Sequence, residues 1–331
     1  MTGKIQSSEI AYSTASQNDV AGLAKLYHEF YPHLGWTERY LNWQYYENPA
    51  GHAKIWVAKA GGAIIATYVA IPHQVYVGGK TGLGWRIQDV ITRPEYRGQG
   101  IYHHLSGVAT KALSAPEFLF SFTFPKEGST SHNGFIRSGW SNLFQVPLHI
   151  LADVRPLKRQ TVPAAVSSIG SFDSSVDSVW SSHVSRFRFA LDRSSSYLNW
   201  RYSANPKGKY ASFKLTLDGD VLILILKHYD REDGTRWAHL CDWFQLQGHS
   251  ALTEAAVKHW INFALDLGCQ TMSCWSPEGG MLAQILERYH FVRNHAQSWR
   301  LVAKSNLDST MEKQMGSEAQ WHLSMGDSDV F

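Results

Sequence analysis

Polar and apolar positions alternate with a period of two from Ile87 to Thr92, which is the spacing of a β-strand. Pro94 ends this strand, because proline has no N–H group to give to a neighbouring strand. Beyond Gly100 the apolar residues recur on one face of a helix, at Ile101, Leu105, Val108, Ala109 and Ala112. The pattern therefore predicts a strand, a glycine-containing turn and a helix in direct succession.

The same patterns predict a regular order of elements in the first half of the chain. A helix capped near Ser16 or Asn18 comes first, and a short aromatic helix follows it. Gly61-Gly62 marks the turn of a hairpin that precedes the strand with Asp89. The expected bounds are 19–31 for the first helix, 55–77 for the hairpin, 117–124 for the next strand, 133–138 for a late helix and 143–152 for a closing strand.

A twelve-residue segment occurs twice. Residues 40–51, Tyr-Leu-Asn-Trp-Gln-Tyr-Tyr-Glu-Asn-Pro-Ala-Gly, recur at 197–208 as Tyr-Leu-Asn-Trp-Arg-Tyr-Ser-Ala-Asn-Pro-Lys-Gly. Eight of these twelve residues are identical, at a constant offset of 157. In each copy a short helix stops at Asn-Pro and leads into a hairpin. Two tandem domains of one fold are the simplest explanation of this repeat.

The second half repeats the expected order of the first. Its elements are predicted at 176–184 (helix), 211–217 (strand), 236–246 (strand), 253–267 (helix), 270–275 (strand), 281–289 (helix) and 297–303 (last strand). The segment 161–175 is rich in Ser, Ala and Val and is expected to contain the linker. We therefore predict domains at 1–155 and 156–303, and a tail, 304–331, that docks on the body. The fold class is α/β (α+β): two mixed, mostly antiparallel twisted sheets flanked by helices.

Size and composition are typical of a soluble enzyme. The chain has 331 residues, enough for two domains with sizeable cores, and a net charge of only +3, which does not favour nucleic acid as a partner. No apolar run approaches the length of a membrane span, and the N-terminal segment has no signal-peptide core. Cys241, Cys269 and Cys274 have no metal-site spacing, so we expect reduced core cysteines in a cytoplasmic protein and no metal.

The turn Arg97-Gly98-Gln99-Gly100 has the composition of an anion site. It leaves successive backbone N–H groups at the start of a helix, where the helix dipole favours a phosphate or diphosphate. Glycine allows the backbone to approach such an anion closely. Ile101 and Tyr102 stand where a nucleoside-triphosphate loop needs Lys and Ser or Thr, and His103 stands where a dinucleotide fingerprint needs its third glycine. Neither of those two cofactor classes fits.

The remaining pattern resembles the acyl-CoA signature of the GNAT superfamily of N-acyltransferases. That signature is Arg/Gln-x-x-Gly-x-Gly/Ala after a strand, often preceded by Pro-x-Tyr. Pro94-Glu95-Tyr96, Arg97 and Gly100 match it, and Tyr102 replaces the final small residue. In the second half, Gln247-Gly248-His249-Ser250 has one glycine and no arginine, so this half resembles a degenerate copy. The repeated Trp-x-Tyr-x-x-Asn-Pro box, the strand end Phe124-Pro125 and the closing segment 321–329 are similar to tandem members of the superfamily encoded with polysaccharide-synthesis genes, and this resemblance covers nearly the whole chain.

The resemblance implies a site and a mechanism. Acyl-CoA, most simply acetyl-CoA, is the expected co-substrate, with its diphosphate on Arg97, Gly98, Gln99, Gly100, Ile101 and Tyr102. The pantetheine arm is expected along Val90, Ile91 and Thr92, and the N–H of Val90 or Ile91 polarises the carbonyl by analogy. An amine with a pKa of about 10 is mostly ammonium at neutral pH, so a base is useful, and Asp89 is the candidate. The alternative for Asp89 is a strand-edge or capping role.

A general acid for the leaving thiolate is harder to assign. Many family members place a tyrosine four residues before a Gly-Phe/Trp pair on the late helix, and here that position is Phe135, which has no proton to donate. The other candidates by proximity in the sequence are Tyr102, His103, His104, Ser131 and His132, each with an ordinary surface or packing role as the alternative.

The acceptor site is expected near the aromatic segment that ends at Tyr46. Aromatic faces stack on sugars and hold amines by cation–π contact. Because Tyr40, Leu41, Trp43 and Tyr45 recur in the copy without a cofactor loop, we assign them to the core, and Trp36 and Tyr46 are the acceptor candidates. In the tail, Trp321, Leu323 and Met325 alternate as in a strand, and Asp327 or Asp329 is expected to face a cationic acceptor; a solvated terminus is the alternative.

The predicted function is transfer of an acyl group from acyl-CoA to a primary amine of a small molecule, such as an amino sugar. One alternative is a non-catalytic CoA-binding or scaffold protein, which the phenylalanine at 135 favours. Another is an aminoacyl-tRNA-dependent transferase, which also pairs two such domains but requires a basic groove for RNA. The oligomeric state is not predicted, and no membrane insertion is expected.

Overall fold

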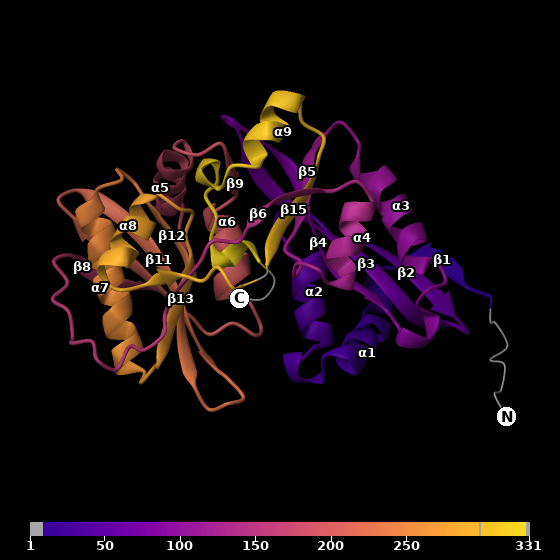
Figure 1. Cartoon of the computed structure of the whole chain (residues 1–331), viewed down its shortest axis with the longest axis horizontal. Coiled ribbons are helices and arrows are strands. Elements are labelled where there is room, and N and C mark those ends of the chain that lie inside the picture. The colour runs from indigo at the N-terminus through magenta and orange to yellow at the C-terminus, as the bar shows by residue number, and fades with distance from the viewer. Residues whose placement is uncertain (1–8, 298, 329–331) are drawn as a thin grey trace. The chain divides into compact units, whose positions relative to one another are not determined.

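A computed structural model describes residues 9–297 and 299–328 of the chain. The chain forms two compact units (Figure 1). Unit 1 comprises 1–73, 83–141 and 302–306, and unit 2 comprises 74–82, 142–301 and 307–331. Each unit has one mixed, mostly antiparallel sheet with helices against it, so the predicted fold class is confirmed.

The first sheet has the strand order β1-β2-β3-β4-β5-β15-β6, where β6 is Ser141–Gln145. Only β4 and β5 run parallel among the pairs with a described register. Its strands are β1 (Ala11–Thr14), β2 (Lys54–Ala60), β3 (Ala63–Val77), β4 (Lys80–Thr92), β5 (Phe118–Thr123) and β15 (Arg300–Ser305). Its helices are α1 (Val20–Phe30), α2 (Glu38–Tyr46), α3 (Ile101–Leu113) and α4 (Thr130–Arg137), with 3-10 turns at Gln17–Asp19, Pro32–Leu34 and Pro94–Tyr96.

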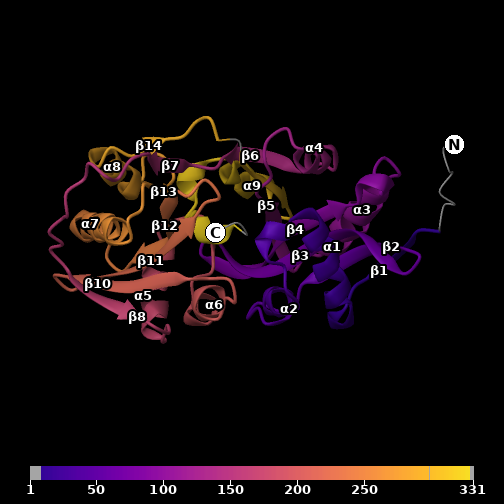
Figure 2. The same cartoon turned by 90° about the horizontal axis from the view of Figure 1, so that it is seen from below.

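Side-chain alternation gives the two faces of this sheet different helices. Trp85 and Ile87 of β4 pack with Ile101 and Leu105 of α3 in one buried cluster. Figure 2 shows α4 above the strands and α2 below them. Arg86 and Gln88, which alternate with Trp85 and Ile87, therefore lie on the opposite face of β4. This face is turned towards α1 and α2.

The sheet of unit 2 has the order β14-β7-β13-β12-β11-β10-β8, again with one parallel pair, β12 and β13. Its strands are β7 (Leu148–Leu151), β8 (Ala165–Ile169), β10 (Tyr210–Leu217), β11 (Asp220–Asp230), β12 (Arg236–Gln245), β13 (Thr271–Trp275) and β14 (Val292–Arg293). The strand β9 (Phe189–Leu191) pairs with residues 75–77, and β6 spans Ser141–Gln145. The helices are α5 (Ser175–Val184), α6 (Ser195–Leu198), α7 (Ser250–Asp266), α8 (Met281–Arg288) and α9 (Ser309–Met315).

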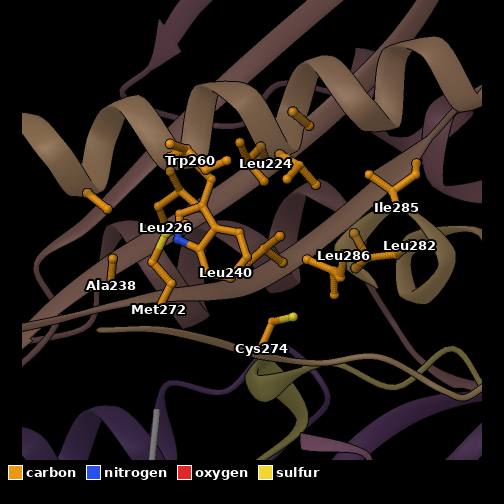
Figure 3. Packing of buried hydrophobic residues seen from close by; sticks show 14 of the residues in the cluster. Leu224, Leu226, Ala238, Leu240, Trp260, Met272, Cys274, Leu282, Ile285 and Leu286 are labelled. Carbon is orange, nitrogen blue, oxygen red and sulfur yellow. The ribbon is translucent and has the colours of Figure 1, made fainter. Parts of the chain in front are cut away.

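The core of unit 2 lies between its sheet and the helices α7 and α8 (Figure 3). Leu224, Leu226 and Leu240 point from the strands towards Trp260 of α7 and Leu286 of α8, and none of these side chains is more than 2% exposed. Burying a leucine of this kind stabilises a fold by about 2 kcal/mol.

Two expected sheet positions are wrong. Of the segment 143–152, which was expected to close the first sheet, β6 does stand at the end of that sheet, but β7 lies between β14 and β13 in unit 2. The last strand of the second half, β15, pairs antiparallel with β5 in unit 1, from Val302 with Thr123 to Ser305 with Phe120. An alternating pattern identifies a strand but does not choose its partner, so the sequence could not show that the two last strands are exchanged.

Smaller differences concern edges and ends. The expected linker contains β8, which pairs with the edge of β10. The short strand β1 is exposed along its whole length and was not predicted. The alternating tail residues Trp321, Leu323 and Met325 are buried, but they form no strand, and Met325–Asp327 is a 3-10 turn. These side chains are buried because they pack within unit 2, and their alternation does not reflect a strand in a β-sheet.

Candidate active site

The turn between β4 and α3 has the backbone conformation that its glycines allow. Gly98 has a φ of 76° and Gly100 a φ of 78°, in the left-handed region that side chains rarely adopt. A Cβ atom at either glycine would meet no other heavy atom within 4 Å, so both positions are open on that side. Residues 97–100 are all exposed. The glycines therefore shape a turn that a ligand can approach.

The amides of this turn have the arrangement of an anion site. The N–H of Arg97 donates to Pro94 O at 3.2 Å, and that of His104 donates to Gly100 O at 3.0 Å. Within the described residues, the six N–H groups between them, at 98–103, donate to no backbone oxygen. They stand at the positive end of α3, where a diphosphate is favoured. The residues present therefore fit the diphosphate of CoA, and Arg97, whose Nε donates to Thr92 O at 3.1 Å, adds a positive charge beside them.

Asp89 lies three residues before the end of β4, at a break in the regular strand. Its φ is 50°, and its side chain is half-buried. The Tyr45 hydroxyl donates to Asp89 Oδ2 at 2.6 Å and the Gln88 amide donates to the same oxygen at 2.8 Å. The backbone oxygen of Asp89 accepts from Thr67 Oγ1 at 2.6 Å. Side-chain and backbone bonds thus fix this carboxylate on the face of β4 that is turned towards α2.

The strands β4 and β5 pair over only part of their length. Their described register runs from Leu83 with Phe118 to Arg86 with Phe122. Six further residues of β4 follow, and among them Val90 is half-buried and Ile91 is buried. The predicted positions for the pantetheine arm therefore lie on β4 beyond the segment paired with β5, directly after Asp89 and before the glycine turn.

The candidates for a general acid have different surroundings. Phe135 has no acidic proton, and its side chain is 2% exposed and packs in the core. The ring of Tyr102 lies against α4, where a Cβ on Gly134 would come within 2.8 Å of it. Burial raises the pKa of Tyr102. The missing side chain of Gly134 therefore makes room for the tyrosine that replaces the small residue of the signature.

The histidine and serine candidates occupy two helices. His103 and His104 are exposed on α3, and the ring of His104 stacks on Tyr12 with centroids 3.8 Å apart. His132 is buried on α4, where its Nδ1 accepts from Gly128 N at 3.3 Å, and Ser131 shares a 3.1 Å hydrogen bond with Ser129. None of these contacts joins them to Asp89.

Both acceptor candidates of the aromatic segment lie close to the tyrosines beside Asp89. The ring of Trp36 is 5.1 Å from that of Tyr27, whose hydroxyl lies 3.2 Å from that of Tyr45. The ring of Tyr46 is 6.4 Å from that of Tyr45. Both Trp36 and Tyr46 are half-buried, and burial raises the pKa of Tyr46. The structure thus brings the two candidates to one aromatic group around Tyr45.

Of the two acidic acceptor candidates in the tail, the structure describes only Asp327. Asp327 is fully buried in unit 2, and one of its oxygens lies 2.6 Å from Nη2 of Arg193. This contact contradicts the expectation that Asp327 faces a cationic acceptor, because a guanidinium of the chain itself holds it. The solvated-terminus alternative is also wrong for this residue. Asp329 lies outside the described residues.

Tyr45 is the residue of this site that sequence reasoning missed. It is fully buried, as expected of a core residue, yet its hydroxyl bonds to the candidate base. The second copy has the same bond, from Tyr202 to Asp242 Oδ2 at 2.8 Å. The signal in the sequence was a tyrosine that recurs at the same offset together with an aspartate in the strand that follows the hairpin of each copy.

Metal sites, reactive thiols and membrane-spanning helices were also considered for residues 9–297 and 299–328. No three His, Cys, Asp or Glu side chains there form a group that could hold a metal ion. Cys241, Cys269 and Cys274 are buried thiols, and burial raises the pKa of Cys241 to about 12. Within the same residues, no helix has the length and apolar character that a membrane span requires.

Comparisons with known proteins agree with this geometry. Residues 12–141 match the model of the acetyltransferase (GNAT) domain. A search of curated protein sequences gave no match. Among solved structures, a GCN5-related N-acetyltransferase from Anabaena variabilis is similar with a TM-score of 0.62 and 16% identity, over 90% of this chain and 73% of that one.

Two further structures are similar over a comparable share of the chain. The N-myristoyltransferase of Saccharomyces cerevisiae, with bound myristoyl-CoA, has a TM-score of 0.62 and 9% identity over 92% of this chain and 80% of that one. A tandem GNAT protein from the clavulanic acid biosynthesis pathway has a TM-score of 0.59 and 13% identity over 91% of this chain and 100% of that one. At such identities these likenesses show the fold. Residues 12–141 thus match a GNAT acetyltransferase domain, and the fold of the chain is similar to that of these acyltransferase structures.

Proposed function

We propose that the chain transfers an acyl group from acyl-CoA to a primary amine, and that unit 1 carries the reaction. The observation that supports this most is the run of six N–H groups at 98–103, which find no backbone acceptor among the described residues, on a turn with two left-handed glycines. Asp89 lies on the strand that leads into this turn. Acyl transfer from CoA requires a binding site for the diphosphate and a general base, and both candidates lie on one strand–turn–helix unit.

The chain's own groups divide the work. The amides at 98–103 and Arg97 hold the diphosphate. The bound co-substrate supplies the reactive thioester, and the backbone N–H of Val90 or Ile91 donates a hydrogen bond to its carbonyl oxygen. Asp89 takes the proton that the ammonium of the acceptor must lose. A C–N bond forms, the C–S bond breaks, and the thiolate takes its proton from solvent, since the proposal assigns no acid of the protein.

The acceptor is a small amine that an aromatic site can hold. Trp36 and Tyr46 lie next to the tyrosines beside Asp89, and aromatic faces bind sugars and cationic amines. We place amino sugars first in a panel of acceptors and acetyl first among acyl groups. A cytoplasmic location remains part of the proposal.

The test is release of free thiol from acetyl-CoA with a panel of amines. We expect turnover with at least one amine and a loss of about a hundredfold in kcat in Asp89→Asn, which lies in the range for general base catalysis. The control Asp233→Asn changes an exposed aspartate of unit 2 and should leave turnover as it is. A longer acyl-CoA in a parallel series measures acyl preference.

A non-catalytic CoA-binding protein is the second candidate, and the buried phenylalanine at 135 favours it. It predicts binding of CoA without thiol release for every amine tested. If the wild type binds CoA and releases thiol, and Asp89→Asn releases none, this second candidate is excluded.

A further inference from the structure

Two hydrogen bonds meet on one oxygen of Asp89. Tyr45 donates to Oδ2 at 2.6 Å, and Gln88 donates to the same atom at 2.8 Å. Tyr45 is 0% exposed, and its hydroxyl also lies 3.2 Å from that of Tyr27, itself fully buried. Tyr45 has a single proton, so when the carboxylate takes it, the contact between the two phenols is a hydrogen bond only if Tyr27 donates; the Tyr27 hydroxyl also contacts Thr67. The three groups therefore lie in a row from Tyr27 through Tyr45 to Asp89.

We infer that Tyr45 is a positioning residue for the reaction: it orients the carboxylate of Asp89 and keeps it ionised, and Tyr27 in turn orients Tyr45. This inference rests on the proposed function, in which Asp89 takes the proton of the acceptor. A half-buried carboxylate is harder to ionise than one in water, and hydrogen bonds to its charged form oppose that effect. A phenol that donates at 2.6 Å is such a bond.

The second copy shows what the same bond does away from a cofactor turn. Tyr202 donates to Asp242 at 2.8 Å, and both side chains are buried. There Nε of Arg193 lies 2.5 Å from Asp242 Oδ2, so a guanidinium of the chain shares the carboxylate. In unit 2 the tyrosine belongs to a structural ion-pair group. The repeat therefore supplies a matched control, in which the same bond can be removed without touching the proposed site.

Among the described residues, ionisable groups near Asp89 come from α1, α2 and β4. Tyr27 comes from α1 and Tyr45 from α2, and burial and the charge of Asp89 raise the pKa of both phenols. On β4, Arg86 Nε donates to Gln88 Oε1 at 3.0 Å, while β3 contributes the non-ionisable Thr67. Four residues further along the chain, Arg93 pairs with Glu29 of α1 at 2.7 Å. The phenols stay neutral at neutral pH, so an acidic limb in the rate reports on the carboxylate.

The experiment measures kcat and KM from about pH 5 to 9 in the wild type, Tyr45→Phe and Tyr202→Phe. In Tyr45→Phe we expect the acidic limb of the rate to move up by about one pH unit, kcat at neutral pH to fall about tenfold, and KM for acyl-CoA to stay constant. Tyr202→Phe should lower the thermal midpoint and leave the limb in place. Gln88→Leu removes the second donor to Oδ2 and should move the limb in the same direction as Tyr45→Phe.

The outcomes are separable. Turnover in the wild type with an acidic limb that Tyr45→Phe does not move overturns the positioning role and leaves the proposed function standing. An equal shift in Tyr202→Phe overturns it too, because the effect would then be one of stability. If Tyr45→Phe does not fold, Tyr27→Phe replaces it, with a smaller shift in the same direction expected and an unmoved limb as the refuting result. Absence of turnover in the wild type removes the proposed function, and the positioning role with it.

Discussion

The turn that precedes the long helix differs between the two units in what satisfies its amides. In unit 1 the N–H groups at 98–103 donate to no backbone oxygen of the described residues. In unit 2 the fully buried carboxylate of Asp220 accepts from Gln247 N at 2.8 Å and from His249 N at 3.2 Å. At the offset of the repeat, the residue that corresponds to Asp220 is Ala63. The chain therefore provides its own anion in one copy and none at this position in the other.

In unit 2 the chain itself therefore supplies the acceptor for the amides of the shorter turn. The start of a helix carries N–H groups that need acceptors, and a carboxylate supplied from the adjacent hairpin serves as well as a phosphate. The same relation holds for the tyrosine–aspartate pairs: Asp242 is shared with Arg193, whereas Asp89 is half-buried beside the proposed acceptor site. In unit 2 both positions thus make contacts with other groups of the chain.

The largest expected effect concerns the ion pairs of Arg193 in unit 2. This side chain is fully buried, with Asp242 at 2.5 Å and Asp327 at 2.6 Å. Arg193→Met leaves two buried carboxylates without their cation, so we expect a loss of about 3–5 kcal/mol in the free energy of unfolding, measured in urea. Arg159→Met, which removes an exposed pair with Asp266, should cause no measurable change. A loss below about 1 kcal/mol in Arg193→Met would show that these pairs do not hold unit 2 together.

The next effect is a dependence of stability on pH. Burial disfavours the ionised form of Asp242, but the charge of Arg193 and the nearby ring of His322 outweigh it and lower its pKa from 3.8 to about 2. A depressed pKa in the folded state stabilises above the unfolded value and is lost as the pH falls through the folded value. We expect about 2 kcal/mol of stability to disappear between about pH 5 and pH 2. Urea unfolding of the wild type and Asp242→Asn measures it, and an equal acid loss in the two proteins contradicts it.

A smaller and more specific effect is expected from exchanging the anion between the units. Ala63→Asp places a carboxylate at the position that corresponds to Asp220, where it should compete with the diphosphate and weaken CoA binding about tenfold, or about 1.4 kcal/mol. Binding is measured by calorimetry. Asp220→Ala is the companion variant: it should lower the stability of unit 2 and leave CoA affinity unchanged. Unchanged affinity in Ala63→Asp would mean that the two turns are not equivalent.

Local spacing was enough to predict most elements of this fold. The helix after Gly100 runs from Ile101 to Leu113 as expected, and the repeat predicted the matching helix and hairpin of each half. Local spacing could not predict which sheet takes β7 and which takes β15, because a strand pairs with whichever open edge the whole fold presents. The short strand β1 escaped notice because its side chains are exposed.

For the site, the sequence predicted the residues whose signal lies in the backbone. Gly98 and Gly100 do adopt the left-handed conformation, and Tyr96, Arg97 and Gly100 lie in one turn, as their spacing predicted. The roles of these residues and of Asp89 remain predictions. Tyr45 was missed because a buried tyrosine shared by two copies reads as packing, and only its position opposite β4 shows the bond to Asp89. Asp327 was misplaced because its partner, Arg193, is far away in the sequence.

Calorimetric titration of the whole chain with CoA tests the central claim most directly, in the wild type, Gly100→Val and Gly219→Val. Both glycines have a left-handed φ, 78° and 79°, and both have open space around them, but only Gly100 lies in the proposed diphosphate turn. The account predicts binding by the wild type and by Gly219→Val, and affinity at least about tenfold weaker in Gly100→Val. Absence of binding heat in the wild type, or equal affinity in all three proteins, would contradict it.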